Sequence, residues 1–385
     1  MYSLNSLVSD ARVMLLSCTI SVRLLVRLLS SKNKTLVGLD IGSSSVKVCE
    51  LRDLGKKSGT RYLVKKLGIV QIPPESIVDG EIINSNAVVD AIRQVMLEQK
   101  IKVNDVAISI SGQQVMVKKM TLQLMSQSEL NESIRWEAES FFPAGQSISS
   151  YVLDYTVSEE RKSDGNMDVI LVACRKDKFE SYVDCAVRAG VKPVVVDVDV
   201  FALQNAFEAN TVHGEFDEVA ALVNIGASIT NFCMMVGKKS IFWRDIAFGG
   251  NRYTQKLMDD WGVTRDGAEA LKRGIHAENR EPAEVELSLA AISNSFADEL
   301  SRNTEFFRTN FKVDRLDKIV LAGGGTKISN LIGILKDRFR INIEALNPFN
   351  LVGVDERAVG SDKAMDIGCA ASVVLGLALR EKGNL

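Results

Sequence analysis

The chain has 385 residues, which is too long for one typical core and favours two lobes or one core with insertions. Hydrophobic residues make up 46% and charged residues 25%, as in an ordinary globular protein, and the net charge of −2 leads us to expect no nucleic-acid partner. The six cysteines form no C-x-x-C pair and there are two histidines. This usage predicts reduced, buried thiols and gives little support for a zinc site or a His-based triad.

Residues 1–33 differ from the rest of the chain. The uncharged run from Val13 to Val22 is too short to span a bilayer, and Arg12, Arg23 and Arg27 flank or interrupt the apolar stretch. A secretory signal would carry its positive charge before the apolar run, so this order argues against one. Two interpretations stay open: a basic amphipathic helix on a membrane surface, or an extension without a role in the fold that results from a start codon set too far upstream.

The body of the chain is predicted to begin with a β-hairpin over 36–51, whose turn holds Gly42 and Ser43. Ser128 is the candidate N-cap of a helix over 128–142. Periodicity predicts the other elements of this half: strands over 62–72, 105–111, 115–124, 151–157, 167–174 and 191–200, and helices over 86–99 and 176–189. Residues of about 105–190 are expected to form a small α/β insert.

The second half repeats this plan. A strand, a turn of small residues and a second strand occupy 219–236, and an apolar strand over 318–322 ends in three glycines. Helices are predicted over 254–261, 284–310, 329–339 and 369–380. We therefore expect two related α/β lobes, the first over 34–210 including the insert and the second over 211–385 with a C-terminal connecting helix.

The first hairpin turn carries the groups that a phosphate chain needs. Gly42 leaves room for close approach, and Ser43, Ser44 and Ser45 supply hydroxyls and a run of backbone N–H donors. Lys47 supplies a positive charge, and Asp40 supplies a carboxylate able to hold a hydrated Mg²⁺ ion. A single turn of this kind is usually a plain hairpin turn.

A second turn of small residues lies at the same point of the second half, at Gly226, Ala227 and Ser228. The pairing favours a function, since two such turns could pinch one triphosphate between two lobes. The segment Gly323–Lys327, "GGGTK", adds a third small-residue turn between a strand and a helix, which fits a backbone passing close to an adenosine.

These segments resemble known nucleotide-binding loops. "GLDIGSSSVKVCEL", "ALVNIGASITNF" and "IVLAGGGTKISNL" are similar to the two phosphate loops and the adenosine loop of the actin, sugar-kinase and DnaK-type chaperone ATPase superfamily, and "GAEALKRG" resembles the adenosine-contacting helix of FtsA-like members. "VDVDVFALQNAF" and "GCAASVVLGLALR" occupy the places of the two helices that connect the lobes. Within that superfamily, "SIRWEAESFFPA" and "ILVACRKDKFESYVDCAVRAGVKP" resemble the PilM family of type IV pilus assembly proteins, and the likeness covers roughly residues 34–382.

The resemblance implies an actin-like ATPase fold with an FtsA-like insert, in the cytoplasm and peripheral at the inner membrane. It implies ATP and Mg²⁺ between the lobes, and docking of the cytoplasmic tail of the inner-membrane protein PilN, with PilO and other pilus components as indirect partners. It leaves open whether the chain forms a homo-oligomer. By the same implication, phosphate and Mg²⁺ are served by Asp40 (through water), Gly42, Ser43, Ser44, Ser45 and Lys47, the second phosphate contact by Asn224, Gly226, Ala227 and Ser228, and adenosine by Glu269, Lys272, Gly323, Gly324, Gly325 and Thr326.

One position departs from that pattern. Residue 224 is Asn, where the superfamily's second phosphate loop usually has Asp. An amide carries no charge and is a poor base, whereas a carboxylate can hold Mg²⁺ or orient an attacking water. We therefore expect nucleotide binding with weak or no hydrolysis.

Other interpretations remain. Trp136, Phe141 and Phe142 in the insert are either core aromatics or the border of a groove for a PilN-type tail. A filament-forming FtsA-like role is one rival function. A small-molecule kinase of the sugar-kinase branch is another, since Asp197 or Asp199 lies near the connection between the lobes, where such a kinase needs its base.

Overall fold

The computed structural model describes residues 36–55, 60–140, 142, 147–161, 163–211, 218–275 and 282–381. The predicted N-terminal extension over 1–33 and the predicted groove residue Phe141 lie outside these described residues.

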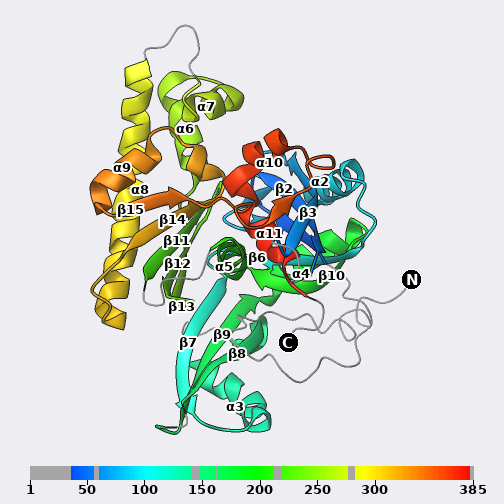
Figure 1. The fold of residues 1–385 in the computed structure, drawn as a ribbon, viewed down its shortest axis with the longest axis vertical. Helices are drawn as coiled ribbons and strands as arrows, with labels where there is room; N and C mark the ends of the chain where they lie inside the picture. Colours follow the sequence, from blue (N-terminus) through cyan, green and yellow to red (C-terminus); the bar gives the residue numbers. More distant parts are fainter. Residues whose placement is uncertain are drawn as a thin grey trace.

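The first lobe is built on a six-stranded sheet with the order β10-β6-β1-β2-β3-β16 (Figure 1). Strands β1, β2 and β3 form an antiparallel meander, and β6 and β10 continue the sheet parallel to β1. The strands are β1 Val37–Ile41, β2 Ser45–Asp53, β3 Tyr62–Gln71, β6 Asp105–Ile110, β10 Lys192–Val198 and β16 Gly353–Val354, and the short β4 Ile77–Val78 and β5 Glu81–Ile82 pair with each other.

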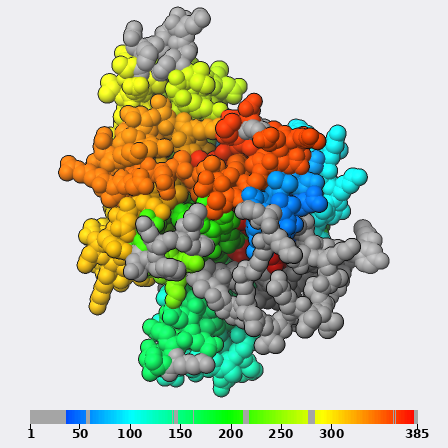
Figure 2. All heavy atoms as spheres, in the orientation of Figure 1, coloured from blue at the N-terminus to red at the C-terminus, as the bar shows by residue number. Residues whose placement is uncertain are grey.

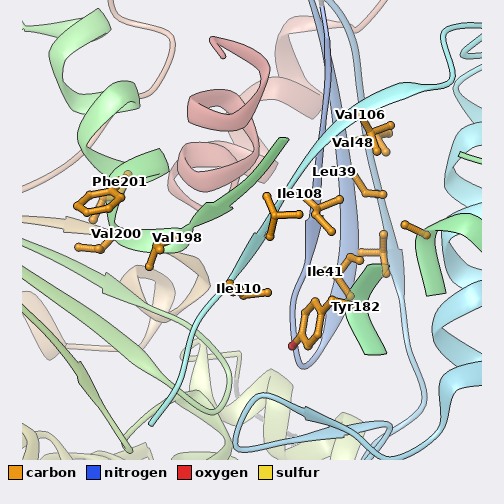
Figure 3. Close-up of a cluster of buried hydrophobic side chains, with 14 of the residues drawn as sticks. Leu39, Ile41, Val48, Val106, Ile108, Ile110, Tyr182, Val198, Val200 and Phe201 are labelled. Carbon is orange, nitrogen blue, oxygen red and sulfur yellow. The ribbon is translucent and has the colours of Figure 1, made fainter. Parts of the chain in front are cut away.

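Helices cover both faces of this sheet because its strands are apolar on both sides. Helices α2 (Ser85–Glu98) and α4 (Lys176–Arg188) pack on one face, and α5 (Asp199–Asn210) and α11 (Ser372–Ala378) on the other. Figure 3 shows part of the resulting core, in which Leu39, Val48 and Ile108 from three adjacent strands lie together.

The second lobe repeats the arrangement with the sheet order β13-β12-β11-β14-β15. Again a meander of three strands is continued by two strands parallel to the first, so the repeated sequence plan corresponds to a repeated sheet. The elements are β11 Val219–Ile225, β12 Thr230–Val236, β13 Lys239–Ile246, β14 Lys318–Ala322, β15 Asn342–Ala345, α6 Gly250–Trp261, α7 Arg265–Lys272, α8 Pro282–Phe311, the 3-10 turn η2 Gly324–Lys327 and α9 Leu331–Phe339.

The insert is a separate three-stranded antiparallel sheet, β7-β9-β8, with one helix packed on it. Its elements are β7 Val115–Gln123, α3 Gln127–Glu139, the 3-10 turn η1 Ile148–Ser150, β8 Tyr151–Arg161 and β9 Asn166–Arg175. Figures 1 and 2 show it projecting from the body of the molecule, with α3 at its far end. The ends of the predicted range of about 105–190 belong instead to the first lobe, because β6 pairs with β1 and β10 and α4 packs on α2.

The two halves are joined by α5 and α11, which pack against each other. Helix α5 lies between the sheets, since it also contacts β11 and β12 (Figure 1). A Cβ atom on Gly376 of α11 would lie 1.7 Å from the carbonyl oxygen of Ala202 on α5, so the two backbones touch and only glycine fits there. Strand β16, α10 (Ser361–Ile367), the 3-10 turn η3 (Gly368–Ala371) and α11 come from the second half of the sequence, and β16 and α11 pack on the first lobe.

Several predicted boundaries are wrong, and two of them matter for the residues discussed below. Helix α3 begins at Gln127 and its N-cap is Ser126, not Ser128. Ser126 and Glu129 form a capping box, in which the Glu129 N–H donates to Ser126 Oγ and the Ser126 N–H donates to Glu129 Oε2. The strand predicted over 191–200 ends at Val198, and Asp199 is the first residue of α5.

Candidate functional site

The first turn, residues 40–47, joins β1 to β2. Asp40 and Lys47 face each other across the hairpin, and Lys47 Nζ lies 2.9 Å from Asp40 Oδ2. The Gly42 N–H closes the turn on the carbonyl oxygen of Ser45 at 3.1 Å. Ser45 is buried, whereas Ser43 is half-buried and Ser44 is exposed. The turn therefore presents two hydroxyls and an anchored lysine.

The second turn, residues 224–229, joins β11 to β12 in the same way. The Gly226 N–H donates to the Ile229 carbonyl at 3.0 Å, and a Cβ atom on Gly226 would lie 2.7 Å from that same oxygen. The start of α6 packs on the turn, because the Gly250 and Asn251 N–H groups donate to the carbonyls of Gly226 and Ala227 at 2.9 and 2.8 Å. Asn251 Nδ2 also donates to Ser228 Oγ at 3.3 Å.

The glycine loop, residues 323–327, lies directly against the second turn. Gly323 has φ +85°, and a Cβ atom there would lie 2.4 Å from the Ile225 carbonyl oxygen and 2.7 Å from Asn224 Oδ1. A Cβ atom on Gly325 would lie 2.2 Å from Ile225 Cγ2, whereas Gly324 has nothing within 4 Å. Thr326 Oγ1 donates to the Gly323 carbonyl at 2.8 Å, so this hydroxyl holds the loop itself.

A charged pair from α7 completes this side of the site. Lys272 Nζ lies 2.6 Å from Glu269 Oε1 and 2.9 Å from Thr254 Oγ1, and it reaches the Gly250 carbonyl at 3.4 Å. Burial opposes charge on both groups and lowers the pKa of Lys272, but the Lys272 charge and its hydrogen bond keep the pKa of Glu269 below the usual value. The structure thus brings together the second turn, the glycine loop, Glu269 and Lys272.

The two lobes meet at Asp199, at the N-terminus of α5. Ser109 Oγ donates to Asp199 Oδ1 at 2.5 Å, and burial, followed by repulsion from Asp40, raises the pKa of Asp199 to about 6. Asp245 of the second lobe raises that pKa further, so charges from both lobes act on Asp199. The tip of Ile229 in the second turn also lies against the first lobe, 3.3 Å from a Cβ atom built on Gly80.

From the sequence, Asp199 was a candidate only as the base of a small-molecule kinase of the sugar-kinase branch. A signal for its placement was present: Ser109 and Ser111 alternate at the end of an apolar strand, so both hydroxyls lie on one face, and both hydrogen-bond to Asp199. The other candidate base, Asp197, is buried and ion-paired with Arg380 at 2.6 Å. That pair ties the end of α11 to β10 and occupies the Asp197 carboxylate.

The aromatic residues of the insert lie in different surroundings. Trp136 on α3 is 77% exposed, whereas Phe142 packs on Tyr151 with 4.5 Å between ring centroids. Trp136 is therefore not a core residue, and Phe142 belongs to the packing of the insert.

In the described part of the chain, no helix combines the length and the apolar character needed to cross a membrane. Nor do the described His, Cys, Asp and Glu side chains form a group of three or more that could ligate a metal ion.

Two related α/β lobes joined by crossing helices, with a turn of small residues at the same point of each, define an actin-like ATPase fold. The structure is similar to that of the ethanolamine utilization protein EutJ from Carboxydothermus hydrogenoformans, with a TM-score of 0.53 and 14% identity over 93% of each chain. It is also similar to a chain of a solved structure described as the PilM-PilN type IV pilus biogenesis complex, with a TM-score of 0.79 and 27% identity over 91% of this chain and 99% of that chain.

The model of the family described as type IV pilus assembly protein PilM matches residues 38–382, and the chain belongs to this family. A more distant relative is the cell division protein FtsA of Buchnera aphidicola subsp. Acyrthosiphon pisum (strain APS), which is 20% identical over 216 residues. That match spans 49% of this chain and 51% of the FtsA chain.

Proposed function

We propose that this protein is an ATP-binding scaffold of type IV pilus assembly that docks the cytoplasmic tail of a PilN-like inner-membrane protein. The observation that supports the nucleotide part is that the second turn, the glycine loop and the Glu269–Lys272 pair are joined by contacts through residues 224–227 and Gly250. In addition, the charges of Asp40 in the first lobe and Asp245 in the second lobe both act on Asp199. Backbone N–H groups in glycine-rich turns are a common phosphate cradle.

The residues present fit Mg·ATP. Asp40 would hold the Mg²⁺ ion through water, and Lys47, already anchored to Asp40, would approach the phosphates. When bound, Mg²⁺ neutralises phosphate charge. The open side of Gly324 leaves room for adenosine, with Glu269 and Lys272 beside it.

The test is calorimetry with Mg·ATP on the wild-type chain and on Lys47→Met. We expect the wild type to bind and the variant to bind at least about tenfold more weakly, because a charge-assisted contact to phosphate is lost. Lys118→Met, which removes an exposed lysine from the insert, is the matched control and should bind as the wild type does. If the wild type takes up no adenine nucleotide at millimolar ligand, the proposal fails.

We propose weak or absent hydrolysis, since residue 224 is an amide and a poor base. Steady-state phosphate release should therefore be slow or undetectable with Mg·ATP. Robust turnover that Asn224→Ala abolishes would contradict this.

The docking part is supported by the solved PilM-PilN complex, one chain of which matches 91% of the present chain. The exposed Trp136 supplies an apolar anchor on the insert, of the kind that short peptides use. Docking of an inner-membrane tail places the protein in the cytoplasm, peripheral at the inner membrane, with PilO and other pilus components linked to it through PilN. Residues 1–33 would add contact with the membrane surface.

A synthetic peptide of the PilN-like cytoplasmic tail should bind, and Trp136→Ala should weaken that binding by about tenfold or more. Leu287→Ala is the matched control, because it removes an equally exposed apolar side chain from α8. Titration of the peptide with and without Mg·ATP measures the coupling of the two sites, and equal affinities would exclude such coupling.

Liposome co-sedimentation of the full chain against a version starting at Lys32 tests the membrane contact, which equal pelleting would exclude.

An FtsA-like filament is the second candidate, because the chain is related to a cell division FtsA. Electron microscopy with Mg·ATP separates the two: filaments favour this candidate, and rings or monomers favour the scaffold.

A further inference from the structure

A row of polar side chains crosses the second sheet and ends at the root of the insert. Asn224, Asn231 and Asp245 are register partners on the adjacent strands β11, β12 and β13. Asn224 Nδ2 donates to Asn231 Oδ1 at 2.7 Å, and Asn231 Nδ2 donates to Asp245 Oδ1 at 2.8 Å. The other Asp245 oxygen accepts the N–H of Gly112 at 2.5 Å. Gly112 belongs to the first lobe, between β6 and the first insert strand, β7.

The chemistry of this row fixes its direction. A carboxylate only accepts hydrogen bonds, so Asp245 must receive the NH₂ group of Asn231 as well as the Gly112 N–H. The Asn231 oxygen must then face Asn224, and Asn224 must donate its NH₂ group to that oxygen. The remaining Asn224 Oδ1 therefore points away from the row and lies beside Gly323, 2.7 Å from a Cβ atom built there.

We propose that Asp245 is a positioning residue which, through Asn231, sets the orientation of Asn224, and that Asn224 and Asp245 are a matched amide–acid pair linking the second turn to the root of the insert. The part of this inference that concerns nucleotide rests on the function proposed above. An acceptor presented beside the glycine loop suits a water bound to Mg²⁺ rather than a phosphate oxygen.

The pair gives a physical reason for the amide at position 224. Aspartate there would place two acceptor oxygens, its own and that of Asn231, against each other in a buried site. The Asn231 amide could flip and donate its NH₂ group to an aspartate at 224. Its oxygen would then face the carboxylate of Asp245. An acid at 224 becomes compatible only when residue 245 is an amide, which can donate to Asn231 and still accept from Gly112.

The test is a double-mutant cycle on the full chain. Asn224→Asp and Asp245→Asn should each lower the melting temperature by roughly 2–6 °C, because each leaves one buried partner unmatched. The double variant Asn224→Asp/Asp245→Asn restores every hydrogen bond with the polarity reversed, and should melt within about 2 °C of the wild type. Asp259→Asn, an exposed carboxylate on α6, is the control and should change nothing. Additive losses in the double variant would overturn the matched pair.

A second measurement separates positioning from a merely structural role. Asp245→Asn should weaken Mg·ATP binding roughly tenfold although residue 245 does not touch the site, and the double variant should recover it. Hydrogen exchange at the amides of residues 111–116 should slow on Mg·ATP addition in the wild type and the double variant, but not in either single variant. Equal exchange in all four chains would overturn the link to the insert. The melting cycle needs no nucleotide. A wild type that binds no ATP would therefore contradict the proposed function, while the melting temperatures would still test the amide–acid pair.

Discussion

Two charged side chains of the first lobe, Lys47 and Asp199, interact with the Asp40 carboxylate. Lys47 attracts it and Asp199 repels it. Lys47 pairs with Asp40 directly, whereas Asp199 is near enough for repulsion to add to the effect of burial and raise its own pKa to about 6. At neutral pH the folded chain therefore carries a buried carboxylate near Asp40 that is stabilised by hydrogen bonds from Ser109 and Ser111.

This arrangement predicts a pH-dependent stability. The pKa of Asp199 rises from 3.8 to about 6 on folding, so its protonated form stabilises the folded state below about pH 4, and that contribution is lost as the pH rises through 6. Asp199→Asn and the wild type should therefore have similar melting temperatures near pH 4. Near pH 7.5 the variant should be the more stable of the two, by at most about 3 kcal/mol in the free energy of unfolding. Melting curves across this range, without Mg²⁺ or nucleotide, measure the difference.

Asp197→Asn is the control for this experiment. Residue 197 lies two positions away but is paired with Arg380, so its loss should lower the stability at pH 7.5. A melting difference between Asp199→Asn and the wild type that is independent of pH would contradict the assignment.

At the scale of elements, local sequence predicted many of the helices and strands, but it missed strands β13 and β15, and further errors fell at the ends of predicted elements. Ser126 and Ser128 both precede an amphipathic segment, and either could cap a helix. Only Ser126 has a glutamate three residues later, and the reciprocal hydrogen bonds with Glu129 follow from that spacing. The capping-box pattern was present in the sequence and would have located the cap.

Ser126→Ala should lower the stability of α3 by about 1 kcal/mol, because the Glu129 N–H loses its acceptor. Ser128→Ala replaces an exposed helical serine and should be neutral or slightly stabilising. Native-state hydrogen exchange of the α3 amides compares the two directly. Equal losses in both variants would argue against Ser126 as the cap.

At the scale of the whole molecule, the contact between α5 and α11 joins the two related halves. Helix α5 follows the first-lobe sheet and contacts both sheets, and α11 returns from the end of the chain to pack on it. The approach at Gly376 and Ala202 is closer than any side chain permits, so the relative position of the helices depends on this one glycine.

Gly376→Ala should destabilise the protein by about 3 kcal/mol, because the new methyl group would overlap the Ala202 carbonyl and force the helices apart. Gly267→Ala on α7 is the matched control, since its nearest neighbour would be 3.5 Å away, and it should stay within about 1 kcal/mol of the wild type. Chemical denaturation measures both. A neutral Gly376→Ala would mean that the two helices cross elsewhere.

The sequence by itself determined many of the elements, the duplication and the turns at residues 40–47 and 224–229, because these depend on local periodicity and on the small residues that tight turns require. It could not decide which side chains meet across more than one hundred positions, such as Gly112 with Asp245 or Asp197 with Arg380. Nor could it show that the short strand β16 pairs with β3 in the first-lobe sheet, or that Trp136 faces solvent. Those features depend on how the lobes pack together, and an isolated segment carries no information about a neighbour that only the folded chain brings to it.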